Sequence, residues 1–128
     1  MRYKKHNQYL IKILIIFLLF SVNLYSQSNN NIQELLKELE VVKSDSAKIQ
    51  IYTKLSRAYT NIDYKLKRKY AEKYMLLGRK LKIDTLEIEG LIDIGISEAL
   101  QQKNDSAYYY FLLAHDKSKV IEYHNGLG

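Results

Sequence analysis

The sequence predicts an all-α chain built of antiparallel helix hairpins. From residue 32 onward, apolar residues recur at spacings of three and four, the period of a helix with one buried face. Proline is absent and only five of the 128 residues are glycine, so little in the chain interrupts a helix. Short polar breaks separate the periodic segments, and short connections make successive helices pack antiparallel.

Residues 1–27 are predicted to be a signal peptide. Its basic residues are Arg2, Lys4, Lys5 and Lys12. Ile13 to Phe20 is an unbroken apolar run, shorter than the roughly 20 residues needed to cross a bilayer. Ser26-Gln27-Ser28 then supplies the small-x-small pattern of a cleavage site. We expect an exported protein, periplasmic or secreted; the alternative is an uncleaved leader that anchors the chain in the inner membrane.

The leader also accounts for most of the positive charge. It holds four of the 20 Lys and Arg residues and none of the 14 acidic ones, so the net charge falls from +6 to +2 without it. A nucleic-acid partner therefore loses its main electrostatic support. The absence of cysteine excludes a cysteine nucleophile and thiolate metal sites.

Residues 28–44 are predicted to form a polar linker, Ser28 to Asn31, and a first helix with Asn31 as its N-cap. The apolar stripe of that helix is Ile32, Leu35, Leu36, Leu39 and Val42. Ser44-Asp45-Ser46 is expected to cap a second helix that ends near Asn61. Its inward face is Ile49, Tyr52, Leu55, Ser56 and Tyr59.

Asp63 is the predicted N-cap of a third helix. The inward stripe of this helix is Leu66, Tyr70, Ala71, Tyr74, Leu77 and Leu81. Four lysines are expected to point largely away from that stripe: Lys65, Lys67, Lys69 and Lys73.

Asp84 is expected to open a fourth helix that runs to about Gln101, with Glu87 as its capping-box partner. The inward residues of this helix are Leu86, Leu91, Ile94, Gly95 and Ala99. Asn104 or Asp105 then caps a fifth helix. A sixth is predicted to begin near Val120.

The helices repeat as pairs. Tyr52, Leu55, Ser56 and Tyr59 recur 39 residues later as Leu91, Ile94, Gly95 and Glu98. Lys67, Ala71 and Tyr74 recur 40 residues later as Ala107, Phe111 and Ala114. In the second pair, the small residues predict a close approach of two helices, with Phe111 filling the space between units.

This pattern resembles the tetratricopeptide repeat, in which a large residue, Leu, a small residue and Tyr on one helix precede Ala-x3-Phe-x2-Ala on the next. The resemblance assigns residues 45–83 to a first repeat, 84–119 to a second, and 120–128 to the start of an incomplete third. Such repeats usually need about three or more units for stability. We therefore expect the chain to be the N-terminal part of a longer repeat protein, or a truncated product.

The resemblance implies a concave groove that binds a protein or peptide partner, without catalysis or a cofactor. Its candidate groove residues are Gln50, Thr53, Lys54 and Arg57 in the first unit and Glu89, Ile92, Asp93 and Ile96 in the second. The alternative is the extracytoplasmic sensory part of a longer signal-transduction protein, such as a sensor histidine kinase or a transcriptional regulator. A membrane is expected only through the leader or a missing C-terminal region.

No residue pattern predicts catalysis or metal binding. His115 has no partner at the three- or four-residue spacing that a helical metal site needs. Four acids share one helix and are predicted to form a solvated acidic face, because acid–base catalysis needs groups that converge from different elements. These acids are Glu87, Glu89, Asp93 and Glu98.

The basic residues from Lys65 to Lys82 alternate with tyrosines that follow the core stripe, so no nucleic-acid surface is predicted. Tyr108, Tyr109 and Tyr110 occupy successive helical positions about 100° apart, so at least one of them is expected to be exposed.

Overall fold

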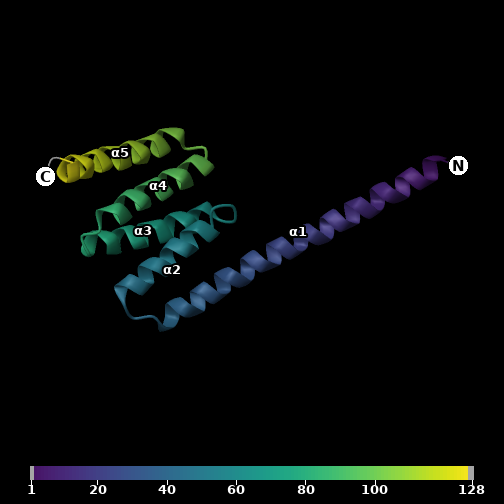
Figure 1. Ribbon diagram of the computed structural model, residues 1–128, viewed down its shortest axis with the longest axis horizontal. Helices are drawn as coiled ribbons and strands as arrows, with labels where there is room; N and C mark the ends of the chain where they lie inside the picture. The colour runs from purple at the N-terminus through teal and green to yellow at the C-terminus, as the bar shows by residue number, and fades with distance from the viewer. Residues whose placement is uncertain (1, 127–128) are drawn as a thin grey trace. The chain divides into compact units, whose positions relative to one another are not determined.

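The computed structural model describes the backbone of residues 2–126 and the side chains of residues 8–18 and 31–122. Over the described backbone, the chain forms five helices and no strand: α1 (Arg2–Val41), α2 (Asp45–Ala58), α3 (Tyr64–Lys80), α4 (Asp84–Leu100) and α5 (Asn104–Gly126). Figure 1 shows α2 to α5 side by side in chain order, each antiparallel to the one before. The predicted all-α fold of antiparallel hairpins is confirmed.

Helix α1 differs from the prediction, because it continues without a break through the expected linker. Asn31 therefore lies inside a helix and is not an N-cap. The chain divides into two compact units, residues 1–34 and 35–128. In the first, every described side chain from Gln8 to Leu18 is exposed. Among the described residues, no helix combines the length and apolarity that crossing a membrane requires.

Two of the predicted helix caps are confirmed. The Ser44 hydroxyl accepts a hydrogen bond from the Ala47 amide at 3.2 Å. The Asp63 carboxylate accepts from the amides of Lys65 and Leu66 at 2.9 and 3.0 Å. These bonds satisfy amides that have no partner within the helix, and they fix where α2 and α3 begin.

The predicted capping box of α4 is wrong. Ile83 occupies the N-cap position and makes no side-chain cap bond, so Asp84 is already helical. Glu87 does not turn back to the helix start, because its carboxylate is bound by cations on two neighbouring helices. The predicted break near Val120 is also wrong, since α5 continues to Gly126. The last two residues of the expected third repeat, 127–128, lie outside the described part.

The core of the stack lies where α2, α3 and α4 meet. Its centre consists of Ile49, Ala71, Tyr74 and Ile94. Helix α3 packs against both α2 and α4, and α4 packs against α5. Most of the inward residues predicted for α2, α3 and α4 are buried or half-buried, and they supply the apolar surface that drives this packing. The prediction is wrong for Leu81 and Ala99, which are exposed because each lies at the C-terminal end of its helix.

Three glycines set how closely the helices approach. A Cβ atom on Gly78 would lie 2.5 Å from the Cβ of Leu86, and one on Gly90 would lie 2.5 Å from the Cβ of Met75. At Gly95, an added Cβ would lie 2.6 Å from the Phe111 ring. This last contact confirms that a small residue of the second pair accommodates Phe111. The predicted place of Phe111 between units is wrong, because the ring packs within its own unit and is 38% exposed.

Helices α3 and α4 end in the same kind of turn. The Ile83 amide donates to the Gly78 carbonyl and the Lys82 amide to the Arg79 carbonyl, and the corresponding amides of Lys103 and Gln102 do the same at the end of α4. This is the Schellman pattern, which requires a left-handed residue. Lys82 and Gln102 hold that position, with φ of 57° and 60°.

The variant Lys82→Gly is expected to be more stable by about 1 kcal/mol, because a left-handed backbone strains any residue with a Cβ atom. Urea-induced unfolding, followed by circular dichroism, measures the change. Lys54→Gly is the matched control, since Lys54 is exposed within α2 and glycine there should lower stability by a similar amount. If Lys82→Gly lowered the stability as Lys54→Gly does, the backbone strain at Lys82 would be negligible.

Candidate functional site

The eight candidate groove residues lie on α2 and α4, and we refer to them together as the α2–α4 face. Five of the side chains are exposed: Gln50, Lys54, Arg57, Glu89 and Ile92. The other three are half-buried: Thr53, Asp93 and Ile96. Thr53 donates its hydroxyl to the Ile49 carbonyl within its own helix, as threonine commonly does in helices.

Asp93 joins three helices through its carboxylate. Oδ1 accepts a hydrogen bond from Lys67 Nζ of α3 at 2.8 Å. Oδ2 accepts from the hydroxyls of Ser56 of α2 and Tyr74 of α3, both at 2.9 Å. The Ser56 hydroxyl also lies 3.3 Å from the Lys67 carbonyl. Asp93 is therefore engaged inside the protein, where it forms the floor of the α2–α4 face instead of a free binding group.

Lys67 corrects the prediction for the third helix, because it points inward and is only 2% exposed. Its stem crosses the apolar core and its ammonium ends at Asp93. Helical periodicity alone assigned this lysine to the outside. The repeat pattern carried the missing signal, since Lys67 corresponds to Ala107, which is buried in the second unit.

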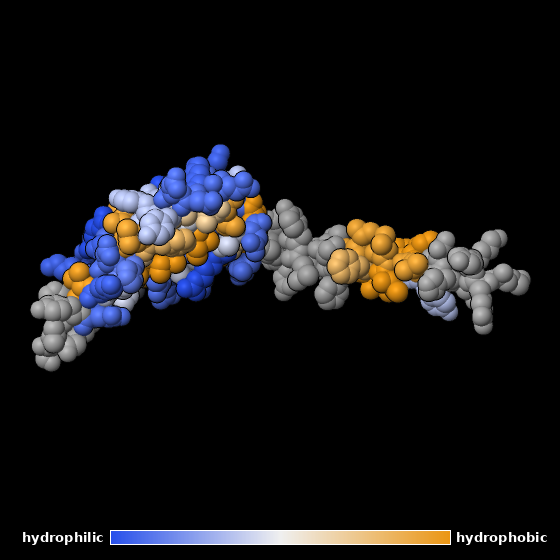
Figure 2. All heavy atoms as spheres, turned by 90° about the horizontal axis from the view of Figure 1, so that it is seen from above, coloured by the Kyte–Doolittle hydropathy of each residue, from blue (hydrophilic) through white to orange (hydrophobic). Residues whose placement is uncertain are grey.

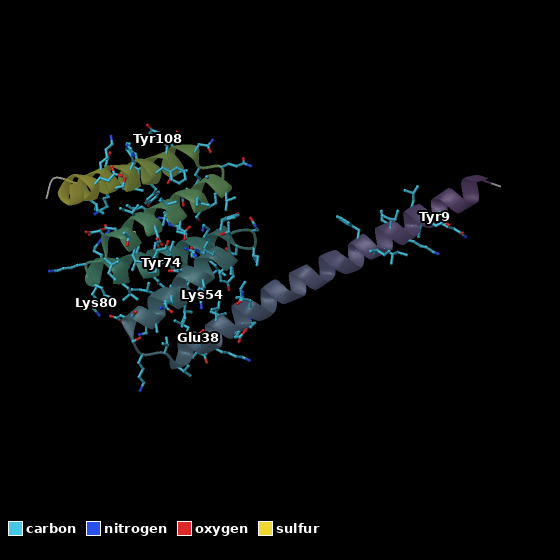
Figure 3. The ribbon with its side chains drawn as sticks, viewed as in Figure 1. Tyr9, Glu38, Lys54, Tyr74, Lys80 and Tyr108 are labelled. Carbon is cyan, nitrogen blue, oxygen red and sulfur yellow. The ribbon has the colours of Figure 1, made fainter. Side chains whose placement is uncertain are left out.

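The side chains around this floor carry both signs of charge. Burial raises the pKa of Tyr74 well above the ordinary value, and the charge and hydrogen bond of Asp93 add to the rise. Glu89 raises that pKa further whereas Arg57 lowers it, so Arg57 of α2 and Glu89 of α4 both act on the Tyr74 hydroxyl. Within the described part of the chain, neither residue belongs to an ion pair. In Figure 3, Tyr74 lies inside the stack and Lys54 lies on α2.

The predicted solvated acidic face is wrong for three of the four acids of α4, because Asp93 is engaged by three donors and Glu87 and Glu98 are buried. Glu87 is bound by Arg79 of α3 at 2.6 Å and by Lys117 of α5 at 2.9 Å. Glu98 is bound by Arg68 of α3 and lies 3.8 Å from Lys103. Each carboxylate is compensated by cations from other parts of the stack, which is how a charge is tolerated in a protein interior.

Arg68 extends its ion pair into a small network. It donates to Glu72 at 2.8 Å and to the Tyr110 hydroxyl at 3.2 Å, and its guanidinium lies 5.5 Å from the centre of the Tyr110 ring. The bond to Glu72 raises the pKa of Arg68, and the bond to Glu98 raises it further, against the effect of burial. The network connects α5 to α3 across the edge of α4.

Acid is expected to destabilise the stack. Burial alone would raise the pKa of Glu87 and Glu98, but the hydrogen bonds from Lys117 and Arg79, and from Arg68 and Ser106, outweigh it and lower both pKa values. The unfolded chain therefore binds more protons than the folded one as the pH falls below the ordinary glutamate value of about 4.5. The stabilisation should be complete above this value and disappear as the pH falls through the folded pKa values.

Urea midpoints measured at about pH 7, 5, 4 and 3 test this expectation. In the double variant Glu87→Gln, Glu98→Gln, the urea midpoint should fall much less between pH 7 and pH 3 than it does in the parent chain. An unchanged decline in that variant would assign the acid sensitivity to other carboxylates. Glu89→Gln is the matched control, because Glu89 is exposed on the same helix and makes no ion pair in the described residues.

The basic stretch of α3 is largely engaged within the protein. Lys67 and Arg68 bind acids of α4, and Lys69 and Lys73 lie over the rings of Tyr70 and Tyr52 at 5.8 and 5.2 Å. The ring of Tyr70 stacks on those of Tyr59 and Tyr52, with centroids 5.7 and 6.0 Å away. These lysine stems cover aromatic surface rather than form a separate cationic patch.

The α2–α4 face offers charged and apolar contacts on a rigid base, a chemistry suited to binding. In the described residues, no three His, Cys, Asp or Glu side chains gather as metal ligands. Every buried side-chain nitrogen or oxygen among them has a hydrogen-bond partner, so no polar atom is left aimed at a missing group. Comparison with family models, curated proteins and solved structures finds no match to this chain.

Proposed function

We propose that this chain is an exported, tetratricopeptide-like repeat module that binds a polypeptide partner on the α2–α4 face. The proposal assigns it no catalysis and no cofactor. Its main support is the convergence of exposed side chains from two helices over a fixed floor. Arg57 of α2 and Glu89 of α4 are exposed and have opposite electrostatic effects on the Tyr74 hydroxyl, and the Asp93 carboxylate of α4 accepts a hydrogen bond from Ser56 of α2.

The character of the face favours an extended peptide of mixed charge. Lys54 and Arg57 provide cations on α2, Glu89 provides an anion on α4, and Ile92 adds an exposed apolar side chain. A peptide that crosses from α2 to α4 would meet positive charge first and negative charge second. Charge order of this kind contributes more to selectivity and association rate than to affinity.

A peptide library screened against the 128-residue chain in detergent micelles tests the proposal. For the best binder, Arg57→Glu should raise Kd by about tenfold or more, as expected for a central contact. Lys65→Glu is the matched control, because Lys65 is an exposed lysine of α3 outside the face, and its Kd should stay within about twofold. Equal losses in both variants, or no loss in either, would exclude the face as the binding site.

The support for export is the N-terminal leader, residues 1–27. The basic residues and the exposed apolar stretch of α1 fit a targeting segment. Mass spectrometry of the protein expressed in a bacterium should find a product that begins near Gln27 or Ser28. An intact N-terminus in the membrane fraction would favour the anchored alternative, and an intact N-terminus in the soluble fraction would contradict export.

A further inference from the structure

Helix α5 presents an aromatic and apolar surface on its outer side. Tyr108 is 69% exposed, Tyr109 57%, Leu112 43% and Phe111 38%, all within little more than one helical turn. Tyr108 lies at the outer edge of the stack, on the side of α5 away from α4 (Figure 3). In Figure 2, which views the stack from the α5 side, apolar atoms form a band among hydrophilic ones. A clustered surface of this kind marks an interaction site more often than scattered apolar residues do.

The polar residues around this surface are arranged in a self-complementary way. Five exposed positions lie along one stripe of α5, within about 80° at 100° per residue: Asp105, Tyr108, Leu112, Asp116 and Lys119. Leu112 is at the middle, with Asp105 seven residues before it and Lys119 seven residues after. In the described part of the chain, neither charge has an ion-pair partner.

A two-fold axis through Leu112 would bring these residues into register. In an antiparallel pair of α5 helices, positions equally far before and after Leu112 face each other. Asp105 then faces Lys119 of the second copy, and the Tyr108 hydroxyl can donate to Asp116 of the second copy. Each contact occurs twice, as two-fold symmetry requires, while Tyr109 and Phe111 enlarge the apolar centre.

We infer that the outer face of α5 pairs with the same face of a second copy of this chain, with the helices antiparallel and Leu112 at the axis. The charge pattern favours this occupant, because the same stripe carries opposite charges at its two ends. A parallel pair would instead place Asp105 against Asp105 and Lys119 against Lys119, which like-charge repulsion disfavours. The pairing uses none of the residues of the α2–α4 face, so both surfaces can be occupied at once.

The absence of cysteine makes a direct test possible. In the 128-residue chain in detergent micelles, Leu112→Cys introduces the only thiol. Mild oxidation should convert most of the chain into a disulfide-linked dimer, because residues at the axis come within bridging distance. Leu76→Cys is the matched control, because Leu76 is 55% exposed on α3 and the variant chain keeps the same leader. It should give little dimer under the same conditions.

A charge exchange then separates the specific pair from random collision. In the Leu112→Cys background, Asp105→Lys and Lys119→Asp should each reduce the dimer several-fold, and the two together should restore it. Equal cross-linking at positions 112 and 76, or a double exchange that does not recover the dimer, would overturn the inference. A chain that stays monomeric in all variants would also overturn it and leave the face to another polypeptide.

Discussion

Asp93→Ala is expected to lose about 3–5 kcal/mol of free energy of unfolding, the largest effect of any single substitution considered for this chain. The loss is large because the substitution leaves the buried ammonium of Lys67 without its partner. The Lys67 side chain is 2% exposed, and its Nζ lies 2.8 Å from Asp93 Oδ1. The substitution also removes the acceptor of the Ser56 and Tyr74 hydroxyls. Urea-induced unfolding of the 128-residue chain measures the loss.

A second substitution at Lys67 provides the control. Lys67→Met keeps much of the volume of the stem and leaves Asp93 its two hydroxyl donors, so its loss should be smaller. In the double variant Lys67→Met, Asp93→Ala, the buried ammonium is gone, and stability should recover above that of Asp93→Ala. Losses that simply add across the two sites would show that the pair does not act as a unit.

Gly90→Ala is expected to lower stability by about 2 kcal/mol, although alanine is a better helix former than glycine by about 1 kcal/mol. The new Cβ would lie 2.5 Å from the Cβ of Met75, an atom attached directly to the backbone of α3. No side-chain rotation removes that overlap, so α3 and α4 must move apart. Separation of the two helices strains the core that they share.

Gly95→Ala is the matched comparison on the same helix. There the new Cβ meets the Phe111 ring, which is 38% exposed and has space to turn outward. Its loss should therefore be small, within about 1 kcal/mol of the parent. Thermal and urea unfolding of both variants test the difference. A Gly90→Ala chain as stable as the parent would show that this contact does not set the spacing of α3 and α4.

Most of the fold follows from local sequence signals. Apolar periodicity identified most of the inward residues of α2, α3 and α4, and the caps Ser44 and Asp63 fixed where two helices begin. These signals depend on residues within one or two turns, so they can be read along the chain. Ile51 was missed even though it is 1% exposed, because it lies off the main stripe of α2.

The charged interior could not be predicted in the same way. Lys67, Glu87 and Glu98 look like surface residues in a helical pattern, and each is buried because a partner of opposite charge reaches it from another helix. These partners lie 26 to 30 residues away in the sequence. Periodicity within one helix contains no such information. The alignment of the two repeats was the sequence signal that indicated burial, because it places Lys67 at the position of Ala107.

The exposed part of the α2–α4 face was easier to predict than its floor. Five of its eight residues are exposed as a binding surface requires. Asp93 had the same apparent role in the sequence, but its carboxylate is occupied by Ser56, Lys67 and Tyr74. The difference arises because the repeat pattern gives the direction of a side chain, whereas its contacts depend on what neighbouring helices place beside it.

The two cations that bind Glu87 come from different helices, and this arrangement predicts an order in which the helices of the stack separate. When α5 detaches, Glu87 loses Lys117 but keeps Arg79, so α4 stays neutralised against α3. Helix α5 can therefore detach while α3 and α4 stay together. Separation of α3 from α4 would also remove Asp93 from the buried ammonium of Lys67. Backbone amides should accordingly exchange with solvent deuterium faster in α5 than in α3 and α4.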